Sequence, residues 1–285
     1  MPITYTPLRF PGGKSKIYSF MISLIETNEL RGCVYAEAFC GGAGLAMKLL
    51  LKNDVSKVVL NDCDPAIYSI WDAVVHHPDE LCTYIDSVQL GMDEWERCHE
   101  LYQNADEPSL ELGKAALFLN RTNRSGILTG GVIGGKAQTG TYKIGARFNR
   151  KTLREKVQKI SARSGDIELH NLDVLDFMST VAPELGGHSL LYLDPPYVQK
   201  GPGLYENSFT DENHRVLASR IKQYAEKWMV TYDTDDLVDE LYAPADDWAI
   251  TVDGIKVGYS ATTTRNTATE RLVLGPGVKM PKHST

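Results

Sequence analysis

The chain has 285 residues, 42% of them hydrophobic and 24% charged, which is typical of a globular protein and excludes a disordered or fibrous one. Its formal net charge of −7, taken over the whole chain, argues against a nucleic-acid partner. No apolar run approaches the roughly 20 residues that a bilayer requires. The N-terminus also lacks the apolar core of a secretory signal, so we expect a cytoplasmic protein without membrane contact.

Short apolar runs and helical patterns alternate along much of the chain. The runs predict strands at residues 34–38, 58–60, 167–169, 190–193, 229–232, 249–252 and 271–274. Helical patterns lie at residues 15–27, 44–52, 65–76, 153–161 and 213–228. This alternation predicts an α/β fold with a doubly wound, mainly parallel seven-stranded sheet. The last segment, 275–285, contains two prolines and is expected to fray.

The alternation stops between about residues 67 and 153, where helical patterns at 78–89, 92–103 and 111–121 follow one another. A glycine-rich stretch at 127–144 then predicts a hairpin or an extended loop. We therefore expect one α/β domain, formed by residues 1–66 and 157–285, that is interrupted by a mainly helical insertion at residues 67–156.

Positive charge is concentrated in and just after this insertion. Residues 114–163 contain twelve Lys or Arg and one acid, Glu155, although the chain as a whole is acidic. A charge run alone usually marks a solvated helix face. Here glycines and asparagines accompany the bases, and such a loop can approach a phosphate backbone and reach base edges. The combination predicts a surface that faces nucleic acid.

Glycines follow the first predicted strand at Gly41, Gly42 and Gly44, directly before a helix. A turn of this kind lets a ligand approach the backbone at the helix N-terminus. The second predicted strand ends at Asn61 and Asp62, about 20 residues later, where an acid suits hydrogen bonding to ribose hydroxyls. Together the two features predict an adenosine-containing cofactor without specifying which one.

Residues 190–197 (LLYLDPPY) carry the sharpest signal. An apolar strand ends at Asp194, and the two prolines fix the backbone so that Asp194, the Pro195 carbonyl and Tyr197 converge at the carboxyl end of the sheet. The bland alternative is a rigid surface turn. The acid and the carbonyl could accept hydrogen bonds from an exocyclic amine while Tyr197 stacks on the base.

With these motifs, nearly the whole chain resembles the Dam-like (D12 class, α group) DNA adenine-N6 methyltransferases. The segments that carry the resemblance are 7–16 (PLRFPGGKSK), 37–44 (EAFCGGAG), 61–62 (ND), 118–126 (FLNRTNRSG), 171–173 (NLD), 194–197 (DPPY) and 205–210 (YENSFT). The resemblance implies a Rossmann-like, S-adenosylmethionine-dependent enzyme. It would flip an adenine out of double-stranded DNA and methylate its N6 amine, and residues 67–156 would recognise the target.

The resemblance also implies roles for single residues. The expected catalytic residues are Asp194, Pro195, Pro196 and Tyr197. S-adenosylmethionine, with S-adenosylhomocysteine as its product, is expected to contact Arg9, Lys14, Glu37, Phe39, Gly41, Gly42, Gly44, Asp62, Asp173 and Asp194. DNA contacts are expected from Arg121, Asn123, Arg124, Lys136, Lys143, Arg147, Asn149 and Tyr205. We expect no metal, and a monomer, or a dimer on DNA, in a bacterial or phage-infected cell.

Several alternatives stay open. Cytosine-N4 methylation uses the same physics, although Asp before Pro-Pro-Tyr favours adenine by resemblance. A non-catalytic DNA-binding protein could retain the fold, whereas a Rossmann oxidoreductase would leave the basic insertion unexplained. A cytosine-C5 enzyme needs a Pro-Cys nucleophile, which the sequence lacks. The glycine-rich stretch has no aromatic residue before Tyr142, unlike that of GATC-specific members, so the target sequence stays open. The biological role also stays open: the enzyme could belong to a restriction-modification system or to a phage, or be a solitary enzyme.

Overall fold

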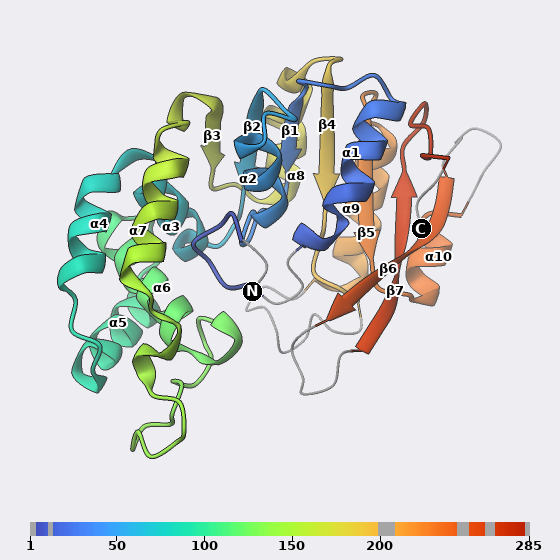
Figure 1. Ribbon diagram of the computed structural model, residues 1–285. Helices are drawn as coiled ribbons and strands as arrows, with labels where there is room; N and C mark the ends of the chain where they lie inside the picture. The colour runs from blue at the N-terminus through green and yellow to red at the C-terminus, as the bar shows by residue number, and fades with distance from the viewer. Residues whose placement is uncertain (1–3, 11–13, 199–208, 244–250, 260–265, 283–285) are drawn as a thin grey trace.

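The computed structural model describes residues 4–10, 14–198, 209–243, 251–259 and 266–282 (Figure 1). At its centre lies a seven-stranded sheet with the order β3-β2-β1-β4-β5-β7-β6. Its strands are β1 (Val34–Glu37), β2 (Lys57–Asn61), β3 (Ile167–His170), β4 (Ser189–Leu193), β5 (Trp228–Tyr232), β6 (Thr251–Tyr259) and β7 (Asn266–Leu274). The first five run parallel, and β7 and β6 continue the sheet in antiparallel pairs. The expected doubly wound, mainly parallel α/β fold is confirmed.

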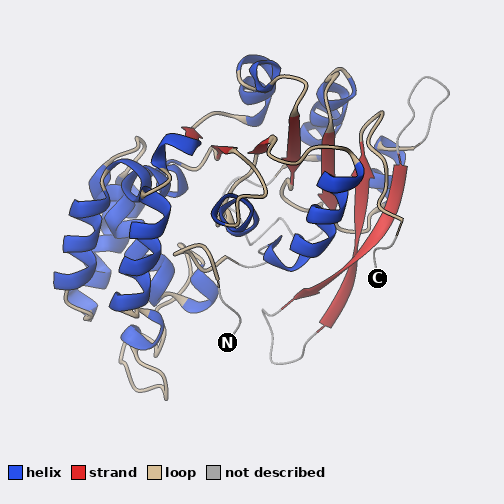
Figure 2. Cartoon of the chain, turned by 45° about the horizontal axis from the view of Figure 1, so that its top comes forward, coloured by secondary structure: helices blue, strands red, loops and turns tan. Residues whose placement is uncertain are grey.

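Helices cover both faces of the sheet (Figures 1 and 2). One face presents Tyr35, Val58 and Leu190 to a large apolar cluster that includes residues of α1 (Tyr18–Thr27) and α2 (Gly44–Leu51). The other face packs on α8 (Val174–Thr180), α9 (Asp211–Lys222) and α10 (Asp236–Leu241). Because both faces are covered, all five residues of β4 are buried, which explains the apolar run at residues 190–193.

Five helices follow one another between β2 and β3, an interval that the structure describes in full: α3 (Pro65–His76), α4 (Pro78–Ser87), α5 (Met92–Asn104), α6 (Leu110–Thr122) and α7 (Arg150–Ser161). Asp64 caps α3 by accepting a hydrogen bond from the Ala66 amide at 2.7 Å. Gly113 brings α6 close to α3, since a Cβ at that position would lie 2.2 Å from the Ser69 carbonyl oxygen.

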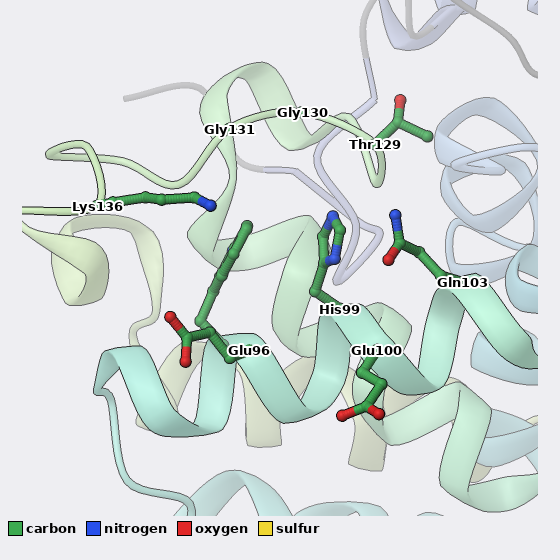
Figure 3. Close-up of a pocket in the computed structure, with 9 residues that line it drawn as sticks. Glu96, His99, Glu100, Gln103, Thr129, Gly130, Gly131 and Lys136 are labelled. Carbon is green, nitrogen blue, oxygen red and sulfur yellow. The ribbon is translucent and has the colours of Figure 1, made fainter.

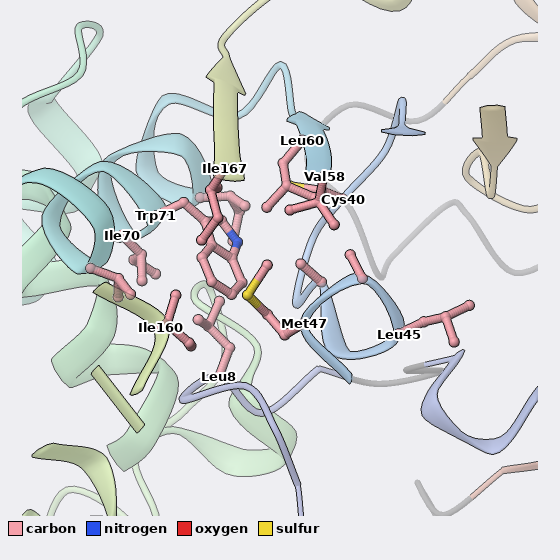
Figure 4. Close-up of a cluster of buried hydrophobic side chains, with 14 of the residues drawn as sticks. Leu8, Cys40, Leu45, Met47, Val58, Leu60, Ile70, Trp71, Ile160 and Ile167 are labelled. Carbon is pink, nitrogen blue, oxygen red and sulfur yellow. The ribbon is translucent and has the colours of Figure 1, made fainter. Parts of the chain in front are cut away.

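The helical region and the sheet share one apolar core (Figure 4). Trp71 of α3 and Ile160 of α7 lie in the same cluster as Met47 of α2 and Val58 of β2. Leu8, from the N-terminal segment, belongs to the same cluster. The helical region is therefore packed against the sheet rather than tethered to it.

Several local expectations were wrong. Residues 127–144 form an extended loop with one isolated bridge, Asn123 to Val132, and the short turn η3 (Ile144–Arg147), so the hairpin alternative does not hold. Helix α9 ends at Lys222, and Trp228 opens a strand. The C-terminal segment does not fray over its described part. Val278 is buried there, and the Asn28 side chain bonds both backbone groups of Lys279.

None of the helices in the described part of the chain is long and apolar enough to cross a membrane.

Candidate active site

The carboxyl ends of the parallel strands meet at one edge of the sheet, where the strand order reverses between β1 and β4. Asn61, at the end of β2, ties this edge together. Its buried amide donates to the carbonyls of Ala38 and Leu172, both at 3.0 Å, and accepts from the Leu172 amide at 3.1 Å. Asn61 thus fixes the segments that follow β1 and β3, on either side of its own strand.

The glycine turn after β1 is held from three sides. The Gly41 amide donates to Asp62 Oδ2 at 2.8 Å, and its carbonyl accepts from Trp71 Nε1 at 2.9 Å. Phe10 lies against the turn, because a Cβ on Gly41 or on Gly42 would sit 2.7 Å from an atom of that side chain. The close approach that requires these glycines therefore includes a protein side chain.

Two expected cofactor residues are acids at this edge, the buried Glu37 and the half-buried Asp62. Glu37, at the end of β1, accepts hydrogen bonds on Oε1 from the Tyr35 hydroxyl at 3.1 Å and the Ala46 amide at 3.2 Å. Burial raises the pKa of Glu37 to about 8. Burial, together with the charge of Asp64, raises the pKa of Asp62 to about 7. Both carboxyls favour either a proton or a cationic, hydrogen-bond-donating neighbour.

Other expected cofactor residues lie around the same edge. Gly44 is the first residue of α2. Asp173 is exposed and caps α8 by accepting from the Leu175 amide at 2.8 Å. Phe39 is partly buried and meets Phe209 edge to face, with ring centroids 5.7 Å apart.

A charged cluster surrounds the Asp-Pro-Pro-Tyr segment after β4. Lys14, in the turn η1 (Lys14–Ile17), places Nζ 3.1 Å from Asp194 Oδ1 and 2.7 Å from Glu270 Oε2. It also lies 2.5 Å from the Tyr197 hydroxyl, which itself donates to Glu270 Oε1. The segment thus starts and ends on residues that are fixed to Lys14.

Asp194 is held from a second direction by Thr231 of β5, whose hydroxyl donates to Oδ1 at 2.8 Å and also contacts the Tyr192 hydroxyl at 2.7 Å. Burial raises the pKa of Asp194, and Lys14 opposes this shift. Burial lowers the pKa of Lys14, but the charges of Asp194 and Glu270 more than offset it, so the net shift is upward. Within the described residues, all hydrogen bonds to Asp194 fall on Oδ1, which leaves Oδ2 for a ligand.

Two expected cofactor contacts do not fit this arrangement. The Lys14 ammonium is already shared by two protein carboxylates, so it is a poor partner for a ligand carboxylate. Arg9 points to the helical region, where its guanidinium donates to the Asn123 carbonyl at 2.9 Å. Its backbone pairs with the Asn120 side chain in two hydrogen bonds of 2.8 Å. Asn120 is a structural residue that the sequence alone did not identify.

A basic cluster forms where the N-terminal segment meets the helical region. It consists of Arg9, Arg121, Arg147 and Lys156. Burial and the charges of Arg9 and Arg147 lower the pKa of Arg121 to about 10, while burial and Arg121 lower that of Lys156 to about 8. Among the described residues, none of the four is paired with a carboxylate, and Arg121 and Lys156 bond to backbone carbonyls instead. The cluster is therefore an unneutralised positive surface.

The other expected DNA residues fall into two groups. Arg124, Lys136, Lys143, Arg147 and Asn149 are exposed, although the Asn149 side chain also caps α7. Asn123 is fully buried. It accepts from Trp95 Nε1 at 2.7 Å and donates to the carbonyls of Ile127 and Leu128, so the expected DNA contact does not fit its position. Tyr205 lies outside the described residues.

A cavity of about 380 Å³ lies apart from the strand ends, between α5 and the extended loop (Figure 3). His99 of α5 points toward the loop that closes it, and Lys136 reaches it from that loop. Glu96 and Glu100 of α5 also contribute to its lining. No group of His, Cys, Asp or Glu side chains in the described ranges could hold a metal ion.

Sequence comparison gives matches to methyltransferases. The sequence profile of the D12 class N6 adenine-specific DNA methyltransferases matches residues 10–252. The curated Type II methyltransferase M.MjaIII of Methanocaldococcus jannaschii is 25% identical over 207 residues, which cover 67% of this chain and 68% of that protein.

Two solved structures show weaker likeness. The rRNA methyltransferase aviRa from Streptomyces viridochromogenes aligns with a TM-score of 0.40 and 14% identity, over 94% of this chain and 87% of its own. A putative RNA methyltransferase from Pyrococcus horikoshii aligns with a TM-score of 0.42 and 10% identity, over 94% and 86%.

Proposed function

Because this chain belongs to the D12 class of N6 adenine-specific DNA methyltransferases, we propose that it transfers a methyl group from S-adenosylmethionine to an adenine flipped out of double-stranded DNA. The observation that carries the proposal is the way in which the Asp194 carboxylate is held. Its carboxylate is fixed at the end of β4 through Oδ1, by Lys14 and Thr231, so that Oδ2 can accept an N–H of the adenine amine.

The chemistry follows from that hydrogen bond. The lone pair of the adenine amine is delocalised into the ring, so the amine must be oriented before it can act as a nucleophile. Asp194 and the Pro195 carbonyl would each accept one N–H, and the Tyr197 ring would stack on the flipped base. The raised pKa of Asp194 also suits its carboxylate to receive the proton that the amine releases. Asp194, Pro195, Pro196 and Tyr197 thus remain the proposed catalytic residues.

The residues at the strand ends suit the cofactor. When bound, S-adenosylmethionine supplies an electrophilic methyl group for direct transfer and leaves as S-adenosylhomocysteine. Two carboxyls with raised pKa values, Glu37 and Asp62, are acceptors that suit an amino group and ribose hydroxyls. The proposed cofactor contacts are Glu37, Phe39, Gly41, Gly42, Gly44, Asp62, Asp173 and Asp194.

We further propose that residues 67–156 recognise the target and that the basic cluster binds DNA phosphates. Its four cations have no carboxylate partner among the residues that the structure describes, and a phosphate backbone requires such a positive surface. The exposed Arg124, Lys136, Lys143 and Asn149 extend this surface toward the loop. Tyr142 is 67% exposed in the same loop, where an aromatic ring could stack on a base. Lys156 and Arg9 are additions to the DNA contacts expected from the sequence.

DNA binding by the basic cluster can be tested through its salt dependence. Each lost phosphate contact lowers the slope of log affinity against log salt by roughly one unit. Arg147→Ala and Lys156→Ala should each do so, whereas Lys52→Ala, at the far end of α2, should leave the slope unchanged. Unchanged slopes for both cluster variants would move the phosphate contacts elsewhere.

The modified base that the protein forms distinguishes adenine methylation from its alternatives. Incubation of the protein with S-adenosylmethionine and unmethylated genomic DNA, followed by nucleoside mass spectrometry, should yield N6-methyladenine. N4-methylcytosine would establish the cytosine alternative, and cofactor binding without any methylated base would establish a non-catalytic protein. The Type II relative supports a restriction-modification role. Sequencing of the modified bases would give the target motif. We propose that the protein acts as a monomer, or as a dimer on DNA.

A further inference from the structure

Glu270 is a buried acid that the expected chemistry does not use. It lies on β7, one residue before Arg271, which pairs with Tyr232 of β5, and its side chain is only 1% exposed. A carboxylate is costly to bury unless it is paired and hydrogen-bonded. Glu270 is both, and its partners belong to the proposed active site.

The two carboxylate oxygens of Glu270 hold two different groups. Oε2 accepts from Lys14 Nζ at 2.7 Å, and Oε1 accepts from the Tyr197 hydroxyl. These two groups also contact each other at 2.5 Å, so that Glu270, Lys14 and Tyr197 form a closed triangle. Lys14 extends the triangle to Asp194 Oδ1 at 3.1 Å. One acid on β7 is therefore linked to both ends of the Asp-Pro-Pro-Tyr segment.

This arrangement restricts the Tyr197 ring. A tyrosine side chain turns about two bonds, and an anchored hydroxyl at its far end fixes the direction of the ring axis. Because the O–H and the lone pairs of a phenol favour the ring plane, two fixed partners of the hydroxyl, Glu270 and Lys14, also favour one orientation of that plane. That plane is the surface on which the flipped base would stack. The same acid keeps the Lys14 ammonium beside Asp194, since Lys14 bridges the two carboxylates.

We propose that Glu270 is a positioning residue for methyl transfer: it fixes the Tyr197 ring through its hydroxyl and, through Lys14, the carboxylate of Asp194. The inference rests on the proposed function, because it gives Tyr197 and Asp194 their roles toward the adenine. Glu270 itself does not touch the base or the cofactor. Its removal should therefore impair turnover much more than cofactor binding.

The first test is Glu270→Gln, which keeps the size of the side chain and its ability to accept from Tyr197, but removes the charge that holds Lys14. Misplacement of a reacting group by about 1 Å costs roughly 100-fold in rate. We expect kcat to fall roughly 10- to 100-fold, while the Kd for S-adenosylmethionine, measured by calorimetry, changes less than threefold. The matched control is Glu240→Gln, an exposed acid paired with Arg215, which should leave kcat unchanged.

The second test separates positioning from mere stability. Tyr197→Phe removes only the hydroxyl that Glu270 anchors, so it should lower kcat without changing cofactor affinity. The double variant Glu270→Gln, Tyr197→Phe should lose clearly less than the product of the two single effects, because both disrupt the same triangle of Glu270, Lys14 and Tyr197. Fluorescence of 2-aminopurine at the target position should fall in both single variants, which reports less base extrusion.

The outcomes are distinct. A wild-type chain that transfers methyl groups and a Glu270→Gln variant that keeps its kcat within twofold would overturn this inference alone. Fully multiplicative effects in the double variant would do the same. If Glu270→Gln fails to fold, Tyr197→Phe decides, and an unchanged kcat in that variant overturns the proposal. A wild-type chain that transfers no methyl group to DNA would overturn the proposed function and this inference together.

Discussion

Replacement of Glu37 by Gln should change how the stability of the protein depends on pH. Glu37 is 5% exposed at the end of β1, and both of its hydrogen bonds are donated by the protein to Oε1. A glutamine oxygen can accept the same two bonds, so the substitution removes the titration and little else. Burial raises the pKa of Glu37 from an ordinary value of 4.5 to about 8.

The sign and the size follow from that shift. A carboxyl with a raised pKa in the folded state contributes stability that is fully present below pH 4.5 and is lost as the pH rises through about 8. Each pH unit between these two values corresponds to about 1.4 kcal/mol in the free energy of unfolding. Between pH 5.5 and pH 8, the free energy of unfolding of the wild type should therefore fall by about 3 kcal/mol relative to Glu37→Gln.

Urea unfolding at four values of pH across that range measures the difference directly. Groups that titrate in both proteins, such as Asp62, cancel when the two curves are subtracted. Glu107→Gln, at an exposed acid between α5 and α6, is the control and should run parallel to the wild type. If the Glu37→Gln curve also runs parallel to the wild type, Glu37 is ionised in the folded protein, and the argument that it awaits a cationic ligand group fails.

Three further substitutions test separate parts of the structure. Thr231→Val removes one of the two groups that fix the Asp194 carboxylate and should lower kcat about tenfold, with unchanged cofactor affinity in calorimetry. Asn123→Ala leaves one buried carbonyl, one half-buried carbonyl and one buried indole N–H without their partner, so urea unfolding should show a loss of about 2–4 kcal/mol; a loss below 1 kcal/mol would contradict this. Gly42→Ala places a Cβ 2.7 Å from Phe10 and should lower the melting temperature by several degrees, about 1–3 kcal/mol, whereas Gly91→Ala, which meets no atom within 4 Å, should not.

The centre of the sheet was predictable because β1, β2, β4 and β5 contain short apolar runs. Helix α3 was also predictable at both ends, since Asp64 and Pro65 mark its start and the periodic apolar pattern ends at His76. The C-terminal segment was not, because its order depends on contacts with Asn28, about 250 residues earlier in the chain. A local pattern carries no information about such a contact.

The candidate site, like the fold, was predictable only in part. The motifs identified Asp194 and Tyr197, but the groups that fix them, Thr231 and Glu270, lie on other strands in segments without a distinctive motif. A charge count indicated a basic surface, yet it could not separate an exposed base such as Lys143 from Arg121, whose guanidinium is held by backbone carbonyls. Asn123 resembled a base-contacting residue by type, and only its burial reveals a structural role.

The central claim is that the carboxylate of Asp194 orients the adenine amine for methyl transfer. Single-turnover transfer to DNA by Asp194→Asn, with the cofactor Kd measured on the same sample, tests it most directly. The asparagine keeps the shape of the side chain but places an amide N–H beside Lys14 or the base. The account predicts a loss of transfer of at least roughly 100-fold with a cofactor Kd within a few-fold of the wild type. Transfer at the wild-type rate would contradict it.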